Sequence, residues 1–199
     1  MARVREFDPA EALVGAMQVF WRRGFTDTSM DDIVKETGVS RYGLYGEFGN
    51  KKGLLVAAMG QYADQMGDLL MADLRKPDAG LEAILGYWQS IREFASEPNS
   101  CPGCLLVNIA SEVAPHDPEI AAEIQRLHAH QVELIASAIR NGQNDGDIPI
   151  NVDDKGAARM MVTLSHGMAL MAGTGAALLE FEGAIDAAIS VLQISEKRS

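Results

Sequence analysis

The residue types that could carry out thiol or metal chemistry are few and poorly spaced. Cys101 and Cys104 form a Cys-Pro-Gly-Cys motif, which serves thiol–disulfide exchange when it lies near a βαβ unit. No strand pattern is visible around it. A structural zinc site would need a second pair of ligands at suitable spacing, which His116, His128 and His130 do not provide. A thiol switch or a metal-responsive site at these cysteines stays open as the alternative to an inert turn.

Carboxylates gather near the N-terminus without forming a catalytic pair. Asp8, Asp31, Asp32 and Glu36 lie at positions that suit helix capping and solvation. We find no constellation of nucleophile, base and acid. The sequence therefore predicts a protein that is not an enzyme, with no cofactor and no bound metal.

Charge is distributed unevenly along the 199 residues. Residues 1–56 carry eight basic and eight acidic side chains, so the whole net charge of −11 falls on the remainder. Such a split indicates two parts with different partners. The N-terminus lacks the apolar region of a secretory signal, and two cysteines are too few for a disulfide scaffold. We therefore expect a cytoplasmic protein.

The elements that position these side chains begin with three short helices. Asp8 followed by Pro9 is a helix start, and Gly24 is the matching stop. Ser29 with an acid three residues later starts a second helix. Gly38 provides a tight turn, and Ser40 caps a third helix that ends near Phe48. The pattern predicts a helix-turn-helix.

The rest of the chain also reads as helices. Helical spacing of apolar residues recurs as far as the C-terminus, with polar or Pro- and Gly-rich breaks between the segments. The expected helices are 51–74, 81–95, 105–113, 118–140, 154–173 and 176–194. With the first three, this predicts an all-α fold of about nine helices.

The segment GFTDTSMDDIVKETGVSRYGLYGEFGNKKGLL, residues 24–55, resembles the DNA-binding segment of the TetR family of repressors. The resemblance runs without gaps and includes the Gly-Phe after the first helix, Gly38-Val39-Ser40 and Leu44-Tyr45. It implies a helix-turn-helix DNA-binding domain at 1–50. Residues 51–199 would then form a helical ligand-binding and dimerisation domain.

The helix that begins at Ser40 would lie in the DNA major groove. We expect Leu44 and Phe48 to pack inward, and we expect Gly43 and Gly46 to let the backbone approach DNA. Arg41 and Tyr42 are the candidates for base edges or adjacent phosphates, and Ser40 and Gly43 are further DNA-binding candidates. The resemblance implies phosphate contacts from Thr28, Ser29, Tyr45 and Lys51. Arg3 and Arg5 could add a basic arm.

The stretch Met160 to Leu179 contains no Asp, Glu, Lys or Arg. Its length would allow a membrane span, but Ser165, His166 and three glycines favour buried packing, so we expect no membrane. The resemblance places this helix and the last one in a homodimer interface, with small residues such as Ala169 at the contact. A two-fold dimer would match a palindromic double-stranded DNA operator.

Residues for a small-molecule effector are expected in the larger, acidic part. The candidates are apolar positions with a few polar exceptions, chief among them Trp88, Cys104, Asn108 and His166. The resemblance thus implies a ligand-responsive regulator, a repressor released from its operator by a small effector, and the apolar candidates favour a hydrophobic one. An activator role stays open, as do the effector's identity and the operator sequence.

Overall fold

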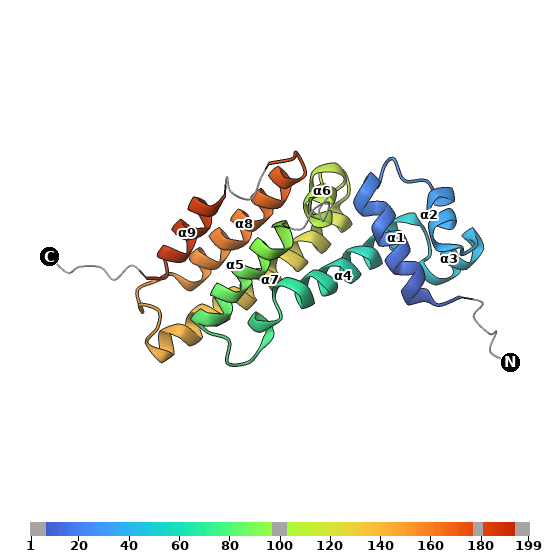
Figure 1. The fold of residues 1–199 in the computed structure, drawn as a ribbon. Helices are drawn as coiled ribbons and strands as arrows, with labels where there is room; N and C mark the ends of the chain where they lie inside the picture. Colours follow the sequence, from blue (N-terminus) through green and yellow to red (C-terminus); the bar gives the residue numbers. More distant parts are fainter. Residues whose placement is uncertain (1–6, 97–102, 177–180, 194–199) are drawn as a thin grey trace. The chain divides into compact units, whose positions relative to one another are not determined.

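The computed structural model describes residues 7–96, 103–176 and 181–193. Nine α-helices, one short 3₁₀ turn and no strand occur in these residues, which confirms the predicted all-α class (Figure 1). The chain divides into two compact units. The first comprises Met1–Gln65 and Leu105–Ile124, and the second comprises Met66–Cys104 and Gln125–Ser199.

The first unit is built on three short helices that start and stop where the sequence indicates. Asp8 caps α1 by accepting a hydrogen bond from the backbone N–H of Ala10 at 2.8 Å. Ser29 and Asp32 form a reciprocal capping box at the start of α2. Gly38 ends α2 with a φ of 69°, a left-handed conformation that favours glycine. The first unit contains α1 (Pro9–Arg23), α2 (Met30–Thr37), α3 (Arg41–Phe48), the first part of α4 (Lys51–Leu70), α6 (Leu105–Glu112) and the start of α7 (Pro118–Asp145).

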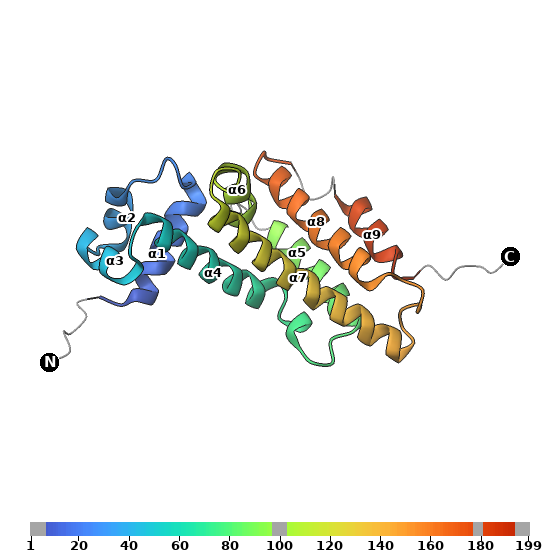
Figure 2. The ribbon, with the colours of Figure 1, turned by 180° about the vertical axis from the view of Figure 1, so that it is seen from behind.

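The second unit is organised around a continuous apolar core. Trp88 on α5 and Ile135 on α7 are fully buried in it, with Met161 on α8 and Ile185 on α9. Both ribbon views show α8 and α9 side by side (Figure 2). The second unit contains the remainder of α4 and α7, the 3₁₀ turn η1 (Asp73–Arg75), α5 (Leu81–Ser96), α8 (Asp154–Ala172) and α9 (Glu182–Ser190).

The helix expected at 51–74 ends earlier, at Leu70. The chain turns there because Met71 and Leu74 are both buried in the core, which a straight helix would not achieve. Arg75 pairs with Asp68 across this turn. Leu69, next to the end of the helix, is 52% exposed.

Helix α7 continues to Asp145, beyond the expected end at Arg140. The Asn-Gly-Gln segment reads as a loop by propensity, but its amides bind other parts of the chain. Asn141 Nδ2 donates to the carbonyl of Ala79 at 2.7 Å, and Gln143 Nε2 donates to that of Val152 at 2.9 Å. Tertiary contacts therefore override local propensity here.

The expected boundary at residue 50 differs from the division between the compact units. Helix α6 and the first part of α4 belong to the same unit as the three N-terminal helices. The stretch Met160 to Leu179 supplies most of α8, and no helix in the described ranges is long and apolar enough to cross a membrane. The last helix, α9, begins at Glu182, later than expected.

Candidate functional site

Helix α3 presents its side chains in two directions. Leu44 is fully buried and anchors the helix in the first unit. Tyr42 is 74% exposed and Tyr45 38% exposed, and Arg41 is also exposed. Ser40 Oγ accepts from the backbone N–H of Gly43 at 3.2 Å, so this hydroxyl caps the helix. An eight-residue helix held by one buried leucine thus offers an aromatic and basic face to a partner.

Arg41 already has a partner in the structure. Its guanidinium lies 2.8 Å from the carboxylate of Asp31 on α2, and both side chains are exposed. An exposed ion pair of this kind contributes ~0–1 kcal/mol. Exchange of Asp31 for a phosphate or a guanine edge therefore costs little, and the pair holds Arg41 near the start of α3.

The two glycines of α3 have different surroundings. A Cβ at Gly46 would meet nothing within 4 Å, as expected for a surface that another molecule approaches. A Cβ at Gly43 would lie 3.1 Å from both the Phe7 ring and the Val39 side chain. Gly43 therefore has a packing role inside the unit, in addition to the DNA approach predicted for it.

The residues before α2 are held by their own hydrogen bonds. Ser29 Oγ and its backbone N–H both bond the Asp32 carboxylate, at 2.6 and 2.9 Å. The Ser29 hydroxyl is the main cause that lowers the pKa of Asp32 to about 2, and Arg23 lowers it further. Ser29 remains exposed beside the N-terminus of α2, where backbone N–H groups and the helix dipole favour anions.

The structure corrects the role predicted for the Thr28 side chain. Thr28 is only 1% exposed, and its hydroxyl donates to the carbonyl of Gly24 at 2.6 Å. That hydroxyl closes the turn after α1 and is turned into the unit. A phosphate contact from this side chain is therefore not supported.

Lys51 at the start of α4 is half-buried. Its ammonium lies 4.3 Å from the centre of the Phe25 ring, an attractive cation–π geometry. Burial lowers the pKa of Lys51, although Glu112 and Asp27 oppose that shift. Its phosphate contact stays a prediction.

A carboxylate that the sequence did not single out ties α6 to the loop after α1. Glu112 accepts the backbone N–H of Phe25 at 2.9 Å and that of Thr26 at 2.6 Å. Burial opposes ionisation of this carboxyl, but these hydrogen bonds outweigh it and lower the pKa of Glu112. A side chain at Gly24 would collide with Glu112, since its Cβ would lie 2.6 Å from the carboxylate. No spacing in the sequence indicates this long-range contact.

Two of the predicted effector residues lie in the second unit among buried aromatics. Trp88 is fully buried, and its indole Nε1 has no hydrogen-bond partner in the described parts of the chain. The Tyr87 ring lies 5.2 Å from it, between ring centres. The Tyr87 hydroxyl is hydrogen-bonded to Ser165 and is close to Cys104, a free thiol. Burial raises the pKa of Tyr87 to about 12.

His166 and Asn108 do not share one structural setting. His166 Nε2 lies 3.1 Å from the Gln131 amide oxygen, and its ring lies 5.6 Å from that of His128. Burial is the main cause that lowers the pKa of His166 to about 4, so the ring is neutral near pH 7. Asn108 is half-buried on α6, in the first unit.

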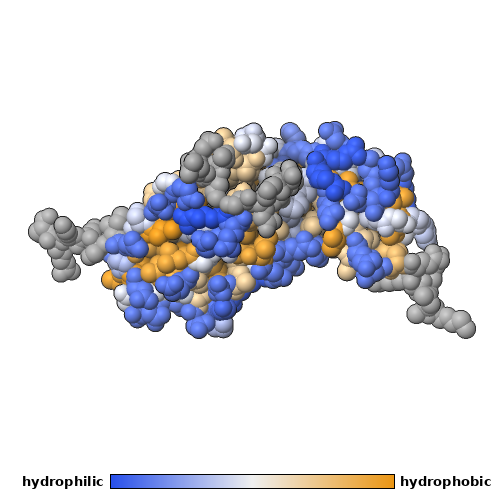
Figure 3. All heavy atoms as spheres, viewed as in Figure 1, coloured by the Kyte–Doolittle hydropathy of each residue, from blue (hydrophilic) through white to orange (hydrophobic). Residues whose placement is uncertain are grey.

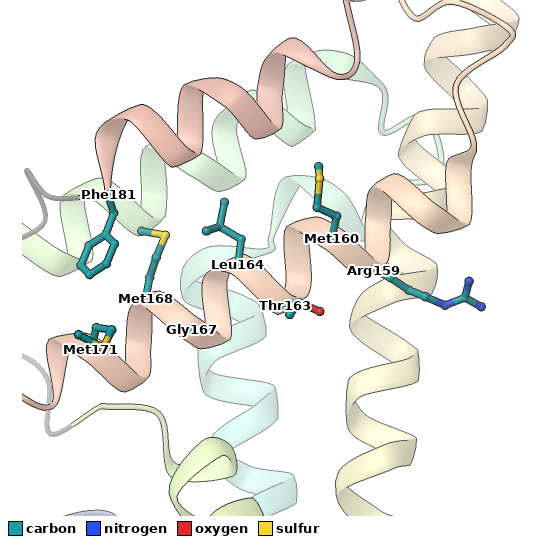
Figure 4. Close-up of a pocket in the computed structure, with 8 residues that line it drawn as sticks. All are labelled: Arg159, Met160, Thr163, Leu164, Gly167, Met168, Met171 and Phe181. Carbon is teal, nitrogen blue, oxygen red and sulfur yellow. The ribbon is translucent and has the colours of Figure 1, made fainter.

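The outer face of α8 carries an open, mostly apolar hollow of about 580 Å³. Met160, Leu164 and Met168 project from α8 on the side where Phe181, at the start of α9, also lies (Figure 4). Ser165 is not on this face, because it contacts Tyr87 on α5. The small residue of α8 that lies on this face with free space around it is Gly167, where an added Cβ would meet nothing within 4 Å.

Several predicted features lie outside the described residues, namely Cys101 and the arm residues Arg3 and Arg5. Within the described residues, no group of three histidines, cysteines or carboxylates lies close enough to hold a metal ion. The thiol alternative therefore stays a prediction.

Comparison with known proteins identifies the class. The family described as "Bacterial regulatory proteins, tetR family" matches residues 12–58. The family described as "Tetracyclin repressor-like, C-terminal domain" matches residues 80–192. The chain belongs to the TetR family, and so it is a DNA-binding transcriptional regulator of the helix-turn-helix class and not an enzyme.

Individual members of the family are similar to this protein along most of its chain. The transcriptional repressor ComR of Escherichia coli K12 is 30% identical over 88% of this chain and 84% of its own. A solved cysteine-substituted variant of the regulator CifR, bound to a 26-bp double-stranded operator, is 25% identical. It matches with a TM-score of 0.79 over 95% of this chain and 98% of its own. A regulator from Cytophaga hutchinsonii, 18% identical, has the same fold with a TM-score of 0.82 over 97% of this chain and all of its own.

Proposed function

We propose that this regulator is a repressor that binds a palindromic operator as a homodimer and is released by a small, largely apolar effector. The observation that carries the proposal is α3. This helix is capped by Ser40 and anchored by the buried Leu44, and it exposes Arg41, Tyr42 and Tyr45 on one face. The CifR relative in complex with operator DNA supports the same use of the fold.

Sequence is read chiefly by Arg41 and Tyr42 in this proposal. Arg41 bonds a guanine edge after it leaves Asp31, and Tyr42 contacts a neighbouring base or thymine methyl. Ser29, Tyr45 and Lys51 bind phosphates, which position the protein without reading sequence. The bare backbone at Gly46 lets α3 enter the groove closely.

The homodimer forms through the outer faces of α8 and α9. Met160, Leu170 and Met171 are 39%, 48% and 44% exposed, a concentration of apolar side chains that a monomer seldom leaves in water. Gly167 allows a second helix to approach closely. A two-fold axis here presents two α3 helices about 34–36 Å apart, one per half-site.

Charge fits the same assignment. The acidic excess falls on residues after 56, which keeps that part off the DNA phosphates and leaves contact to the neutral N-terminal part. Hydropathy colouring shows a mostly hydrophilic visible face on the first unit and more apolar groups on the visible face of the second (Figure 3). The place of action is the cytoplasm, where the DNA of bacteria lies.

The test is a titration by fluorescence anisotropy at fixed physiological salt. The probes are the duplex upstream of the protein's own gene and a shuffled duplex of the same composition. Phosphate contacts alone would bind both duplexes equally, so the ratio of the two affinities decides the result. A preference of roughly 10³ or more, with two chains per site, supports the proposal. Equal, weak binding to this duplex and to overlapping duplexes from the flanking genes would refute it.

A further inference from the structure

The indole N–H of Trp88 is a buried donor that has no hydrogen-bond partner among the residues that the structure describes. The side chain is fully buried, and its Nε1 is the unpartnered buried side-chain polar atom of the described residues. Most buried polar groups in proteins have a hydrogen-bond partner, so an unsatisfied buried donor needs an explanation. A bound molecule that brings an acceptor would satisfy it.

The Tyr87 hydroxyl, on the residue whose ring lies beside Trp88, is already engaged. The Tyr87 hydroxyl bonds Ser165, and Ser165 Oγ donates onward to the carbonyl of Val162 at 2.9 Å. His166 bonds Gln131. The Tyr87 hydroxyl is therefore occupied, whereas Trp88 Nε1 is a donor that a ligand can engage.

No full charge is available to balance a charged ligand in this core. Among the buried residues of the second unit that the structure describes, there is no Asp, Glu, Lys or Arg. The basic side chains Arg92 and Arg140 are engaged with carboxylates near the surface. An unpaired ion in such surroundings is strongly disfavoured. A carboxylate, phosphate or ammonium ligand is therefore excluded.

The core can adapt to a guest because methionines line it. Met161 is fully buried and Met168 is 5% exposed in the same cluster as Trp88. Unbranched thioether side chains repack around irregular shapes more readily than branched ones. Binding can therefore proceed by rearrangement of these side chains.

From these observations we infer the chemical class of the effector. The second unit binds an uncharged, largely apolar molecule with a hydrogen-bond acceptor, such as a carbonyl or ether oxygen, which accepts from Trp88 Nε1. This inference rests on the proposed function, in which an effector binds the second unit. It adds three points to that function: the effector has a hydrogen-bond acceptor, the effector is uncharged, and Trp88 donates to the acceptor.

Three nearly isosteric probes test the inference on the unaltered full-length protein. Acetophenone is neutral and has an acceptor. α-Methylstyrene replaces that carbonyl oxygen by a CH₂ group, and benzoate carries a full charge. The readout is the ¹⁵N–¹H signal of the Trp88 indole, with Trp21 in the first unit as the internal reference.

Acetophenone is expected to shift the Trp88 signal downfield and leave Trp21 in place. It should bind roughly threefold to tenfold more tightly than α-methylstyrene, the contribution of one net hydrogen bond. Benzoate should give no saturable shift. Equal affinity for acetophenone and α-methylstyrene, tighter binding of benzoate, or no Trp88 response up to the solubility limit of the neutral probes would each overturn the inference.

A variant adds a second check. Trp88→Phe keeps an aromatic ring and removes the donor, so the preference for acetophenone should vanish while α-methylstyrene binds as before. If this variant fails to fold by circular dichroism, the probe comparison on the unaltered chain still decides. Operator release is measured in parallel. Binding with the expected preference but without release would refute the effector function and leave the ligand chemistry standing.

Discussion

Both compact units bury apolar side chains, but polar contacts to the backbone are more prominent in the first unit. The first buries apolar side chains such as Phe20 and Leu55. It adds polar contacts to the backbone, such as the Ser29 capping box and the two hydrogen bonds accepted by Glu112. The second relies on a continuous apolar core around Trp88 and Ile135, with its ion pairs at the surface. Directional polar contacts fix the orientation of a short helix, whereas an apolar core tolerates repacking.

This difference between the units suits the two proposed tasks, DNA recognition by the first unit and effector binding by the second. A recognition helix must meet base edges in one geometry, and α3 is an eight-residue helix with a single fully buried residue, Leu44. An effector site must accept a guest, and methionines beside an unpartnered indole allow that.

Gly167→Glu should separate the dimer and remove operator binding. A side chain at this position has open space within the chain, so the monomer should fold normally. In the proposed dimer it would place a charge in an apolar contact. Loss of the second half-site should weaken operator binding roughly a hundredfold or more, because two linked contacts bind cooperatively. Sedimentation velocity and anisotropy measure both effects.

The matched control is Gly60→Glu on α4, where an added Cβ also meets nothing within 4 Å. It adds the same charge and the same helix-favouring backbone change, and it should leave the dimer intact. A Gly167→Glu protein that remains dimeric at micromolar concentration would contradict the assignment of this face.

Arg41→Ala should lower affinity for the operator by roughly tenfold to a hundredfold, as expected for a base-contacting arginine. Arg41→Lys keeps the charge but loses the planar fork that matches a guanine. It should therefore retain binding to shuffled DNA and lose preference for the operator. Anisotropy titrations with both duplexes give the ratio. If Arg41→Lys kept the full preference, Arg41 would be a phosphate contact and not a reader of bases.

Much of the first unit could be predicted from sequence because its signals are local. A cap and its partner lie within three residues of each other, as with Ser29 and Asp32. The positive φ that the turn requires falls on Gly38 alone, a residue type that adopts it readily. The outward direction of Tyr42 followed from helical spacing to Leu44. Thr28 was misjudged because its burial depends on the loop around it.

The second unit and the link to α6 depend on contacts that spacing does not encode. Glu112 lies 87 residues from Phe25 in the chain, and nothing near either residue indicates the pairing. Helix α7 extends beyond its predicted end because the Asn141 side chain bonds residues that come 62 or more positions earlier in the chain. The effector role of Trp88 stays a prediction, and only the folded core showed that its donor has no partner among the described residues.

Glu112→Ala should destabilise the first unit by about 1 to 2 kcal/mol, because two backbone N–H groups lose their acceptor. Glu112→Gln keeps one acceptor oxygen and should lose about half as much. Glu93→Ala, at an exposed position on α5, is the control and should change the free energy of unfolding little. Denaturant unfolding measures the difference. Equal stability of all three variants would mean that the link from α6 contributes nothing.

Acid should weaken the same unit through Asp32. Its folded pKa, about 2, lies below the ordinary value of 3.8. The ionised carboxylate therefore stabilises the fold above pH 4, and this contribution is lost as the pH falls from about 4 to 2. Asp32→Asn should flatten the stability–pH curve in that window, and Ser29→Ala should do the same in part. A curve for Asp32→Asn parallel to that of the unaltered protein would show that the capping box does not depend on charge.

The smallest expected effect concerns the cysteines. Cys101→Ser with Cys104→Ser should leave operator affinity unchanged and should leave release by a neutral acceptor probe intact, because the proposed effector contact is the Trp88 donor. The Cys104 thiol lies close to Tyr87, so a slight change in probe affinity is compatible with that contact. Anisotropy with and without peroxide measures the response of the unaltered protein and of the double variant. Release by peroxide that disappears with the cysteines, while no neutral probe releases the operator, would move regulation from the indole of Trp88 to the thiols. The second unit would then be a redox sensor in which the apolar core has only a structural role.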